Sequence, residues 1–369
     1  MADSAVMTMN GDNGTVNYSV NGGNGTDSYY QNSCYQGISA NYEFRKMKKQ
    51  IAENLDVESL LSGSKVVRMA DLGCATGPNT FTTTQTVLEA IKQKHQSQSP
   101  NSPPPQFQVF FNDLHSNDFN TLFRSLPKDR GYFAAGVPGS CHGPLFADSS
   151  LHFVYTCLCL HFLSKLPEEM KDEKSSLWNK GRIHYTSASE EVLKAYAWQF
   201  GKDMEKFLEA RAKEIVCGGM LVIVMCGSPS GVPLASTAAG IPYDLMASSL
   251  MEMAQEGLIK ESEVDSFNLP LYHSASPEEM VELVEKNGCF SIERAELSEP
   301  TSWLEGPVDI QKWVNSLRAV FRGFFIEHFQ DHIIDDMFER LTKKLLELSD
   351  LVQERCHQKV QLFVVLKRK

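Results

Sequence analysis

The residues that point most directly to chemistry form a glycine turn, Gly73-Cys74-Ala75-Thr76-Gly77, just after Asp71 and a β-branched, apolar run. A tight turn between a buried strand and a helix is typical of the nucleotide-binding corner of a doubly wound α/β sheet. The glycines would let the backbone approach a ligand where a Cβ would clash. The spacing is not that of the dinucleotide motif Gly-x-Gly-x-x-Gly, and no Lys-Ser/Thr pair of a phosphate loop follows.

A second acidic residue, Asp113, ends the next apolar run. An acid at this position can accept hydrogen bonds from both ribose hydroxyls of an adenosine cofactor, whereas the alternative is an ordinary surface aspartate at a strand end. A Pro-rich loop at 97–106 explains why it lies far from the turn. Together with the glycine turn, Asp113 is expected to bind ribose. Asp71, a buried carboxylate that needs a partner, is expected either to fix the turn or to face an ammonium group of the ligand.

The elements that must position these residues alternate between strand and helix along the chain. The glycine turn opens a predicted helix at 80–92, a capping box at Ser187 to Glu190 opens a long helix that Gly218-Gly219 ends, and a helix at 277–286 ends at Asn287-Gly288. Apolar runs predict strands at 66–70, 107–111, 132–137, 151–156, 220–226, 290–297 and 360–366. This order predicts an α/β, Rossmann-like, seven-stranded, mostly parallel sheet closed by an antiparallel pair.

Three segments do not fit the alternation and are expected to form a helical cap over a substrate chamber. They lie at about 159–180, 231–276 and 300–358, and contain helix-like pieces at 244–259, 317–329 and 333–353. Insertions after the carboxyl ends of strands cover the crevice where such sheets bind ligands. Residues 1–27 are rich in Asn, Gly, Ser and Thr and predict a disordered tail before a single domain at 28–369.

Composition excludes several classes of function. The chain has 369 residues and a formal net charge of −11, without a long basic tract, so a nucleic-acid partner is not expected. No apolar run approaches the roughly 20 residues of a membrane helix. Nine cysteines at irregular spacing indicate free thiols in a reducing compartment, which predicts a cytoplasmic protein. Cys157-x-Cys159 lacks partner ligands nearby and is not expected to bind zinc.

Many ordered motifs resemble those of the plant SABATH methyltransferases, named for salicylate, benzoate and theobromine enzymes. The resemblance covers about residue 28 to the C-terminus. The motifs are Ala70-Asp71-Leu72-Gly73-Cys74 with Gly77-Pro78-Asn79, Phe111-Asn112-Asp113, Asn117-Asp118-Phe119-Asn120, Phe123-Arg124-Ser125-Leu126-Pro127, Gly136-Val137-Pro138-Gly139-Ser140, Leu151-His152-Phe153, Leu160-His161-Phe162-Leu163-Ser164-Lys165, Asn179-Lys180-Gly181-Arg182-Ile183-His184-Tyr185, Arg211-Ala212-x-Glu214, Asp265-x-Phe267-Asn268-Leu269-Pro270-x-Tyr272, and Phe329 after Glu327-His328.

The resemblance implies a class I methyltransferase fold with a helical cap, a homodimer, and S-adenosylmethionine (SAM) as the cofactor, which has no phosphate to cradle. It implies SAM contacts at Tyr29, Ser33, Asp71, Cys74, Asn79, Asp113, Leu114, Ser140 and Cys141. It implies acceptor contacts at Gln36, Leu158, His161, Phe162, Tyr243, Tyr272, Leu317 and Val320. Some members also bind a structural Mg²⁺ at positions matching Asn179, Asp265, Phe267 and Asn268, an oxygen set that suits a hard cation.

Most members of this family methylate a carboxylate, which is already an ionised nucleophile at neutral pH. No general base is then required, and the protein supplies alignment and a dry pocket. Gln36 is expected to donate its amide N–H to one carboxylate oxygen, and His161 to the other. From the residues alone, His161 is more readily a satisfied buried histidine and Gln36 a surface residue. Tyr243 and Tyr272 are more readily core or loop aromatics, and Leu317 and Val320 core. The motif match favours the ligand roles.

Four departures from the family pattern bear on specificity, and one of them is the whole segment 37–46. Phe162 stands where many relatives have a Trp whose indole N–H holds the carboxylate, Cys141 replaces an aromatic residue, and Leu158 replaces a Tyr. The chamber is therefore expected to be roomier and more apolar, and to favour a terpenoid-like, aliphatic or alkaloid acid over a small benzoate. Two alternative functions stay open at this point: N-methylation of a xanthine-type ring, and binding of a small molecule without catalysis on a decayed methyltransferase scaffold.

Overall fold

A seven-stranded sheet forms the centre of the computed structural model, which describes residues 18–298, 307–356 and 361–369. Its order is β3-β2-β1-β4-β5-β7-β6, and β7 runs antiparallel to both of its neighbours. The strands are β1 (Val66–Leu72), β2 (Gln106–Asp113), β3 (Phe133–Pro138), β4 (Leu151–Cys157), β5 (Ile215–Cys226), β6 (Phe290–Ser298) and β7 (Gln361–Arg368). All seven predicted strands and the closing antiparallel pair are confirmed.

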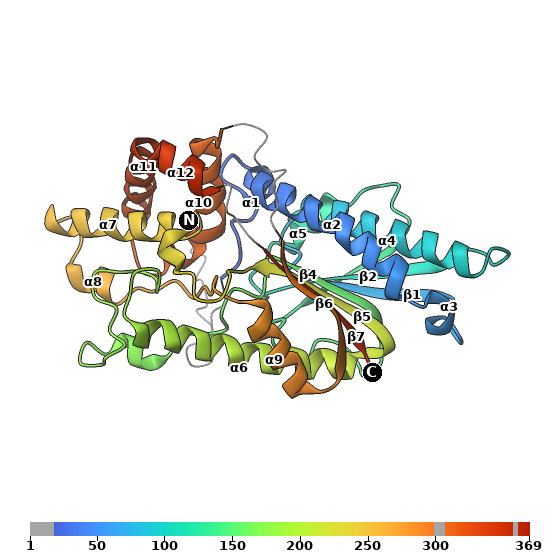
Figure 1. Cartoon of the computed structure of the whole chain (residues 1–369). Helices are drawn as coiled ribbons and strands as arrows, with labels where there is room; N and C mark the ends of the chain where they lie inside the picture. The colour runs from blue at the N-terminus through green and yellow to red at the C-terminus, as the bar shows by residue number, and fades with distance from the viewer. Residues whose placement is uncertain (1–17, 299–306, 357–360) are drawn as a thin grey trace, which may run out of the picture.

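Helices cover both faces of the sheet, as Figure 1 shows. On one face α2 (Cys34–Asn54) and α4 (Asn79–Gln98) pack against a core that includes Val67 and Met69. On the other face α6 (Glu190–Glu214) and α9 (Pro277–Asn287) pack against Ala70 and Leu72. The central strands are buried on both sides, which is why they read as continuous apolar runs.

A second apolar cluster lies outside the sheet and holds the cap together. Its helices are α7 (Ile241–Gln255), α8 (Glu261–Asp265), α10 (Ile310–Ile326), α11 (Asp331–Glu347) and α12 (Ser349–Cys356), at one end of the sheet in Figure 1. The insertion at 159–180 is mostly irregular and contains only the short 3-10 helix η1 (Glu168–Lys171). Residues 300–306 and 357–358 of the third predicted insertion lie outside the described residues.

Two predicted boundaries at α6 are wrong. The helix begins at Glu190, where Ser189 rather than Ser187 accepts a hydrogen bond from the Val192 N–H. Ser187 instead donates its hydroxyl to Asp244 in the cap, over 2.6 Å. The helix ends at Glu214, and Gly218-Gly219 lies within β5, whose pairing with β4 is irregular between Leu151 and Phe153.

The predicted disordered tail is wrong for residues 18–27. Tyr18 packs edge-on against Phe324 of α10 with ring centroids 5.5 Å apart, and the Asn21 N–H donates to the Ala319 carbonyl over 2.8 Å. The Tyr18 ring and the Asn21 backbone thus find partners in α10 that the polar composition of the segment concealed. Residues 1–17 lie outside the described residues.

The remaining helices are short or were missed. They are α1 (Tyr29–Asn32), α3 (Val57–Leu60), α5 (Phe119–Arg124) and the 3-10 helix η2 (Leu234–Ser236). The long helix α2 was not predicted, although Ala40, Phe44, Met47 and Ile51 are all buried along it at helical spacing. Within the described ranges, no helix combines the length and apolarity that crossing a bilayer requires.

Candidate active site

The glycine turn joins β1 to α4 through three residues in the left-handed region, Gly73 at φ 85°, Ala75 at φ 51° and Gly77 at φ 87°. A Cβ added at Gly73 would lie 2.5 Å from the Cβ of Cys159, and one at Gly77 would lie 2.8 Å from the ring of Phe81. The glycines are therefore required by the backbone conformation and by protein side chains packed against them.

Asp113 closes this corner from the end of β2. One carboxylate oxygen accepts a hydrogen bond from the Ala75 N–H of the glycine turn over 2.7 Å, and the other accepts from the Leu114 N–H over 2.8 Å. Burial raises the pKa of Asp113 to about 6, although both backbone hydrogen bonds act to lower it. The carboxylate stays partly open to a cavity, so it can still receive donors from a ligand.

Asp71 connects the end of β1 to the start of α4. The hydroxyls of Thr80 and Tyr155 both donate to Asp71 Oδ2, the latter over 3.0 Å. Burial raises the pKa of Asp71 to about 7, against the two hydrogen bonds that lower it. Asp71 thus joins the strand before the glycine turn to the helix after it and to β4, while its two predicted roles, fixing the turn and facing an ammonium group, stay predictions.

The predicted cofactor residues of the N-terminal segment meet the start of α4. Asn79 donates its amide N–H to both the carbonyl and the hydroxyl of Ser33, each over 3.0 Å. Asn79, Asp71, Cys74 and Tyr29 line a small cavity beside the glycine turn. Ser33 contributes by holding Asn79.

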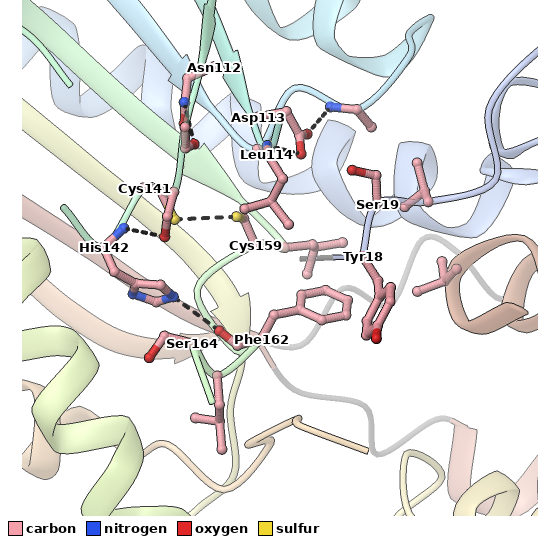
Figure 2. A pocket seen from close by; sticks show the side chains of 18 of the residues that line it. Tyr18, Ser19, Asn112, Asp113, Leu114, Cys141, His142, Cys159, Phe162 and Ser164 are labelled. Carbon is pink, nitrogen blue, oxygen red and sulfur yellow. Dashed lines mark hydrogen bonds between the residues drawn. The ribbon is translucent and has the colours of Figure 1, made fainter. Parts of the chain in front are cut away.

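A larger cavity, called here the cofactor cavity, opens next to this corner (Figure 2). The predicted residues Tyr29, Asp113, Leu114, Ser140 and Cys141 line it. Its lining also includes residues that the sequence analysis missed: Tyr18, Ser19, Val20, His142, Cys159 and Phe324. Of these, Tyr18, Ser19 and Val20 fell in the presumed tail, so no pattern pointed to them.

The loop that carries Ser140 and Cys141 is anchored by a buried ion pair on α6. The Arg211 guanidinium and the Glu214 carboxylate lie 2.7 Å apart, and both side chains are fully buried. Arg211 donates to the carbonyls of Cys141 and Gly143, each over 2.9 Å, and Glu214 accepts from the Leu145 N–H over 2.6 Å. The Arg211-Ala212-x-Glu214 motif therefore fixes one wall of the cofactor cavity.

A second cavity, called here the acceptor cavity, shares part of its lining with the first. All of the predicted acceptor residues except Tyr272 line it: Gln36, Leu158, His161, Phe162, Tyr243, Leu317 and Val320. The ring of Tyr272 instead packs in the core against Phe200 with centroids 4.8 Å apart, while its backbone N–H donates to the His161 carbonyl over 2.8 Å. Tyr272 therefore positions His161 and does not face the acceptor cavity.

The two cavities meet at Leu158. This residue lines both of them and the small cavity beside the turn, and has a φ of 54°, which is strained for a residue with a branched side chain. The strained turn brings the chain after β4 back across the end of the sheet. Tyr29, Phe162 and Val320 also line both larger cavities, so a molecule in one lies next to a molecule in the other.

Polar groups in the acceptor cavity are few, and several were missed. The Ser316 hydroxyl donates to Gln36 Oε1 over 2.8 Å, and the Tyr243 hydroxyl lies 3.3 Å from His273 Nε2. His161, Cys226 and His273 bring their possible ligand atoms within 4.8 Å of one another, a set that suits a soft metal. Cys226 ends an apolar strand and Ser316 lies on the buried face of an amphipathic helix, so both look like core in the sequence.

The four residues predicted to hold magnesium come from the loop before α6, from the last residue of α8 and from the segment that follows α8. Asn179 directs its amide N–H at Asn268 Oδ1 over 2.8 Å, and Asp265 Oδ1 accepts from the Gly181 N–H over 2.7 Å. Hydrogen-bond donors thus already occupy two of the oxygens that a cation would need. As arranged, this donor set does not fit Mg²⁺, which requires several oxygens directed at one point.

Similarity to known proteins agrees with this geometry. The family model described as SAM dependent carboxyl methyltransferase matches residues 15–369. A loganic acid O-methyltransferase of Catharanthus roseus is 45% identical over 93% of this chain and 92% of its own length. A farnesoic acid carboxyl-O-methyltransferase of Arabidopsis thaliana is 37% identical over 93% of this chain and 96% of its own.

A solved structure, loganic acid methyltransferase with SAH, superimposes with a TM-score of 0.90 at 43% identity, covering 95% of this chain and 98% of the other. The class I fold, SAM as the methyl donor and carboxylate methylation are therefore shown, and neither alternative function is needed to explain the site. The chain belongs to the SAM-dependent carboxyl methyltransferases of the plant SABATH family, and it is an enzyme that converts the carboxylate of a small acid into a methyl ester.

Proposed function

We propose that the acceptor acid binds in the acceptor cavity with its carboxylate between Gln36 and His161. The hydrogen bond from Ser316 to Gln36 Oε1 carries this proposal. Because the carbonyl end of the Gln36 amide is engaged by Ser316, the –NH₂ end is the part that remains to donate to a carboxylate. Phe162 has no donor, so the two polar groups share the task that a single Trp indole performs in other members.

The cofactor would bind where Asp113, Leu114 and the loop of Cys141 line the cofactor cavity, with Asn79 and Asp71 beside its amino-acid end. Bound SAM supplies a methyl group activated by a sulfonium. The remaining work belongs to this chain: Asp113 accepts hydrogen bonds from the ribose hydroxyls, and Gln36 orients the carboxylate. Leu158 and Phe162 exclude water at the junction, where positioning can lower the barrier by several kcal/mol.

The acceptor is proposed to be a bulky, mainly aliphatic acid. Trp313, Leu317, Val320, Phe321 and Leu158 give the cavity a largely apolar lining. His273 and Tyr243, next to His161, provide a second polar patch that can meet a hydroxyl of the acceptor. Relatives named for loganic acid and farnesoic acid support an acceptor larger than benzoate.

The test is methyl transfer from radiolabelled SAM to a mixed library of acids, with products identified by mass spectrometry. We expect alkali-labile products from bulky aliphatic acids. Faster turnover of salicylate than of every aliphatic acid would contradict the proposed acceptor class, whereas alkali-stable labelled products would contradict ester formation.

Three further properties are proposed on the family resemblance: a structural Mg²⁺ in a rearranged form of the four-residue site described above, a homodimer and a cytoplasmic location. A magnesium ion would require the amide of Asn179 to turn so that an oxygen replaces its N–H beside Asn268. Thermal unfolding in EDTA and in Mg²⁺ tests the ion, and sedimentation velocity tests the dimer. An unchanged Tm and a monomer would remove the first two proposals.

A further inference from the structure

Two cysteine side chains face each other across the wall of the cofactor cavity. The Sγ atoms of Cys141 and Cys159 lie 3.8 Å apart, and both residues belong to the cavity lining. Figure 2 shows the two side chains pointing toward each other. Cys141 lies in the loop held by Arg211, and Cys159 follows the strained Leu158. They come from segments on either side of β4, so the fold and not the sequence spacing brings them together.

The surroundings of Cys141 favour a reactive thiolate. The hydrogen bond from Cys159, together with nearby His142 and Arg211, lowers the pKa of the Cys141 thiol, while the pKa of Cys159 is raised. A thiolate is the form that reacts with oxidants, and a neighbouring thiol is what converts the first oxidation product into a disulfide. Cys141 is buried, and the cofactor cavity is the space that it lines. An oxidant therefore reaches its thiol through the space that the cofactor would fill.

We propose that Cys141 and Cys159 form a thiol modification site that reacts with hydrogen peroxide to give a disulfide and so lowers the affinity for the cofactor. The inference rests on the proposed placement of the cofactor in this cavity. It assigns the pair a reaction separate from methyl transfer.

The proposed oxidation of the two thiols has two steps. The Cys141 thiolate attacks one oxygen of the peroxide, the O–O bond breaks, and the other oxygen leaves as hydroxide, which takes up the proton released by Cys141. The sulfur of Cys159 then attacks the Cys141 sulfenic acid, the S–O bond breaks, and the hydroxyl leaves as a second water with the Cys159 proton. Both sulfurs are oxidised, and both peroxide oxygens are reduced to water.

The consequence for the cavity follows from the contacts of Cys159. A disulfide needs the two sulfurs about 2 Å apart, so at least one must move toward the other. A Cβ added at Gly73 would lie 2.6 Å from Cys159 Sγ, which shows how closely this thiol packs on the glycine turn. Drawing it toward Cys141 changes the wall at the turn and joins the Cys141 loop to the segment after β4.

The experiment compares the wild-type protein with Cys159→Ser and with Cys217→Ser, whose thiol is exposed on β5 outside the cavities. Each protein is reduced, shown by circular dichroism to be folded, and treated with hydrogen peroxide with and without S-adenosylhomocysteine. Disulfides are mapped without reduction after chymotrypsin digestion, because one tryptic peptide, 131–165, contains Cys141, Cys157 and Cys159 together. S-adenosylhomocysteine affinity is measured by calorimetry before oxidation, after it, and after dithiothreitol.

We expect a Cys141–Cys159 disulfide in the wild type and in Cys217→Ser, with an affinity loss of about tenfold or more that dithiothreitol reverses. In Cys159→Ser this disulfide is absent, and bound S-adenosylhomocysteine slows oxidation of the wild type. Absence of the disulfide, or a disulfide that leaves the affinity unchanged, would overturn the inference. Failure of the reduced protein to bind S-adenosylhomocysteine would instead count against the proposed cofactor site. The disulfide is mapped by a measurement that does not depend on S-adenosylhomocysteine binding.

Discussion

The Ser316 hydroxyl donates a hydrogen bond to Gln36 Oε1 over 2.8 Å, joining α10 of the cap to α2 beside the sheet. Ser316 is almost completely buried, and Gln36 lines the acceptor cavity. The bond selects one of the two amide orientations that Gln36 could adopt. A residue of the cap thus sets the polarity that an acceptor acid meets.

Replacing Ser316 with Ala should let the Gln36 amide turn and weaken acceptor binding. A typical hydrogen bond contributes about 1 kcal/mol, so we expect kcat/KM for the acid to fall about fivefold. The affinity for SAM should not change. Steady-state kinetics checks this, with Asn315→Ala, an exposed neighbour on the same helix, as the control. Equal effects of the two substitutions would contradict the role of Ser316.

Cofactor binding should weaken in acid because of Asp113. Burial places the pKa of its carboxyl at about 6 in the free protein, and ribose hydroxyls donate to the ionised form. Binding therefore favours the carboxylate, and affinity should fall as the pH drops through this pKa, with a midpoint at or below about 6 because the group is partly open to the cavity.

Calorimetric titration measures the affinity for S-adenosylhomocysteine between pH 5 and pH 8, which is roughly the range over which a carboxyl with such a pKa titrates. Asp113→Asn should bind more weakly at neutral pH and show a flatter pH profile. A profile that Asp113→Asn leaves unchanged would remove Asp113 as the titrating group.

Asp71 should make the folded protein less stable as the pH rises, whereas Asp113 makes cofactor binding weaker as the pH falls. Its pKa is raised from 3.8 to about 7, so between these values the folded state binds more protons than the unfolded chain. The free energy of unfolding contributed by Asp71 is then fully present below the lower pKa and is lost as the pH rises to about 7.

Asp71→Asn keeps an oxygen that can accept from Thr80 and Tyr155 but does not titrate. Urea unfolding at several pH values should therefore show that the wild type loses stability relative to Asp71→Asn as the pH rises. Asp148→Asn, at an exposed position, is the control. A constant difference between the wild type and Asp71→Asn would contradict the raised pKa.

Breaking the Arg211–Glu214 pair should destabilise the whole protein. Arg211→Met leaves Glu214 buried and charged without its partner, which typically costs about 3–5 kcal/mol. Urea unfolding measures the loss, and the double variant Arg211→Met/Glu214→Leu should recover part of it. A loss below about 1 kcal/mol in Arg211→Met would show that the pair does not hold the Cys141 loop.

The part of the fold nearest the sheet could be predicted because buried parallel strands are continuous apolar runs, and glycines and an acid mark their ends. The N-terminal segment was harder because isolated apolar residues such as Tyr18 and Val20 carry no periodic signal. Its contacts with Phe324 and the cofactor cavity depend on tertiary packing. Helix α2 did carry a signal, in the spacing of Ala40, Phe44, Met47 and Ile51.

The residues of the candidate site also fall into those that the sequence identifies and those that only tertiary packing brings together. Asp71, Asn79 and Asp113 adjoin a recognisable turn, so motif and position identify them. Ser316 and His273 lie far along the chain from this turn, and only the folding of the cap brings them to the acceptor cavity. Tyr272 illustrates the reverse: the motif match predicts an acceptor contact, whereas its ring packs against Phe200 in the core, as its residue type alone favours.

The most direct test of the account is the effect of Gln36→Ala on methyl transfer to a bulky aliphatic acid. Steady-state kinetics with labelled SAM should show kcat/KM for the acid reduced by about tenfold or more, because a hydrogen bond to a charged group contributes about 1.5–3 kcal/mol. S-adenosylhomocysteine should bind as it does to the wild type. An unchanged kcat/KM, with an alkali-labile methyl ester still formed, would show that Gln36 does not orient the carboxylate and would contradict the proposed site.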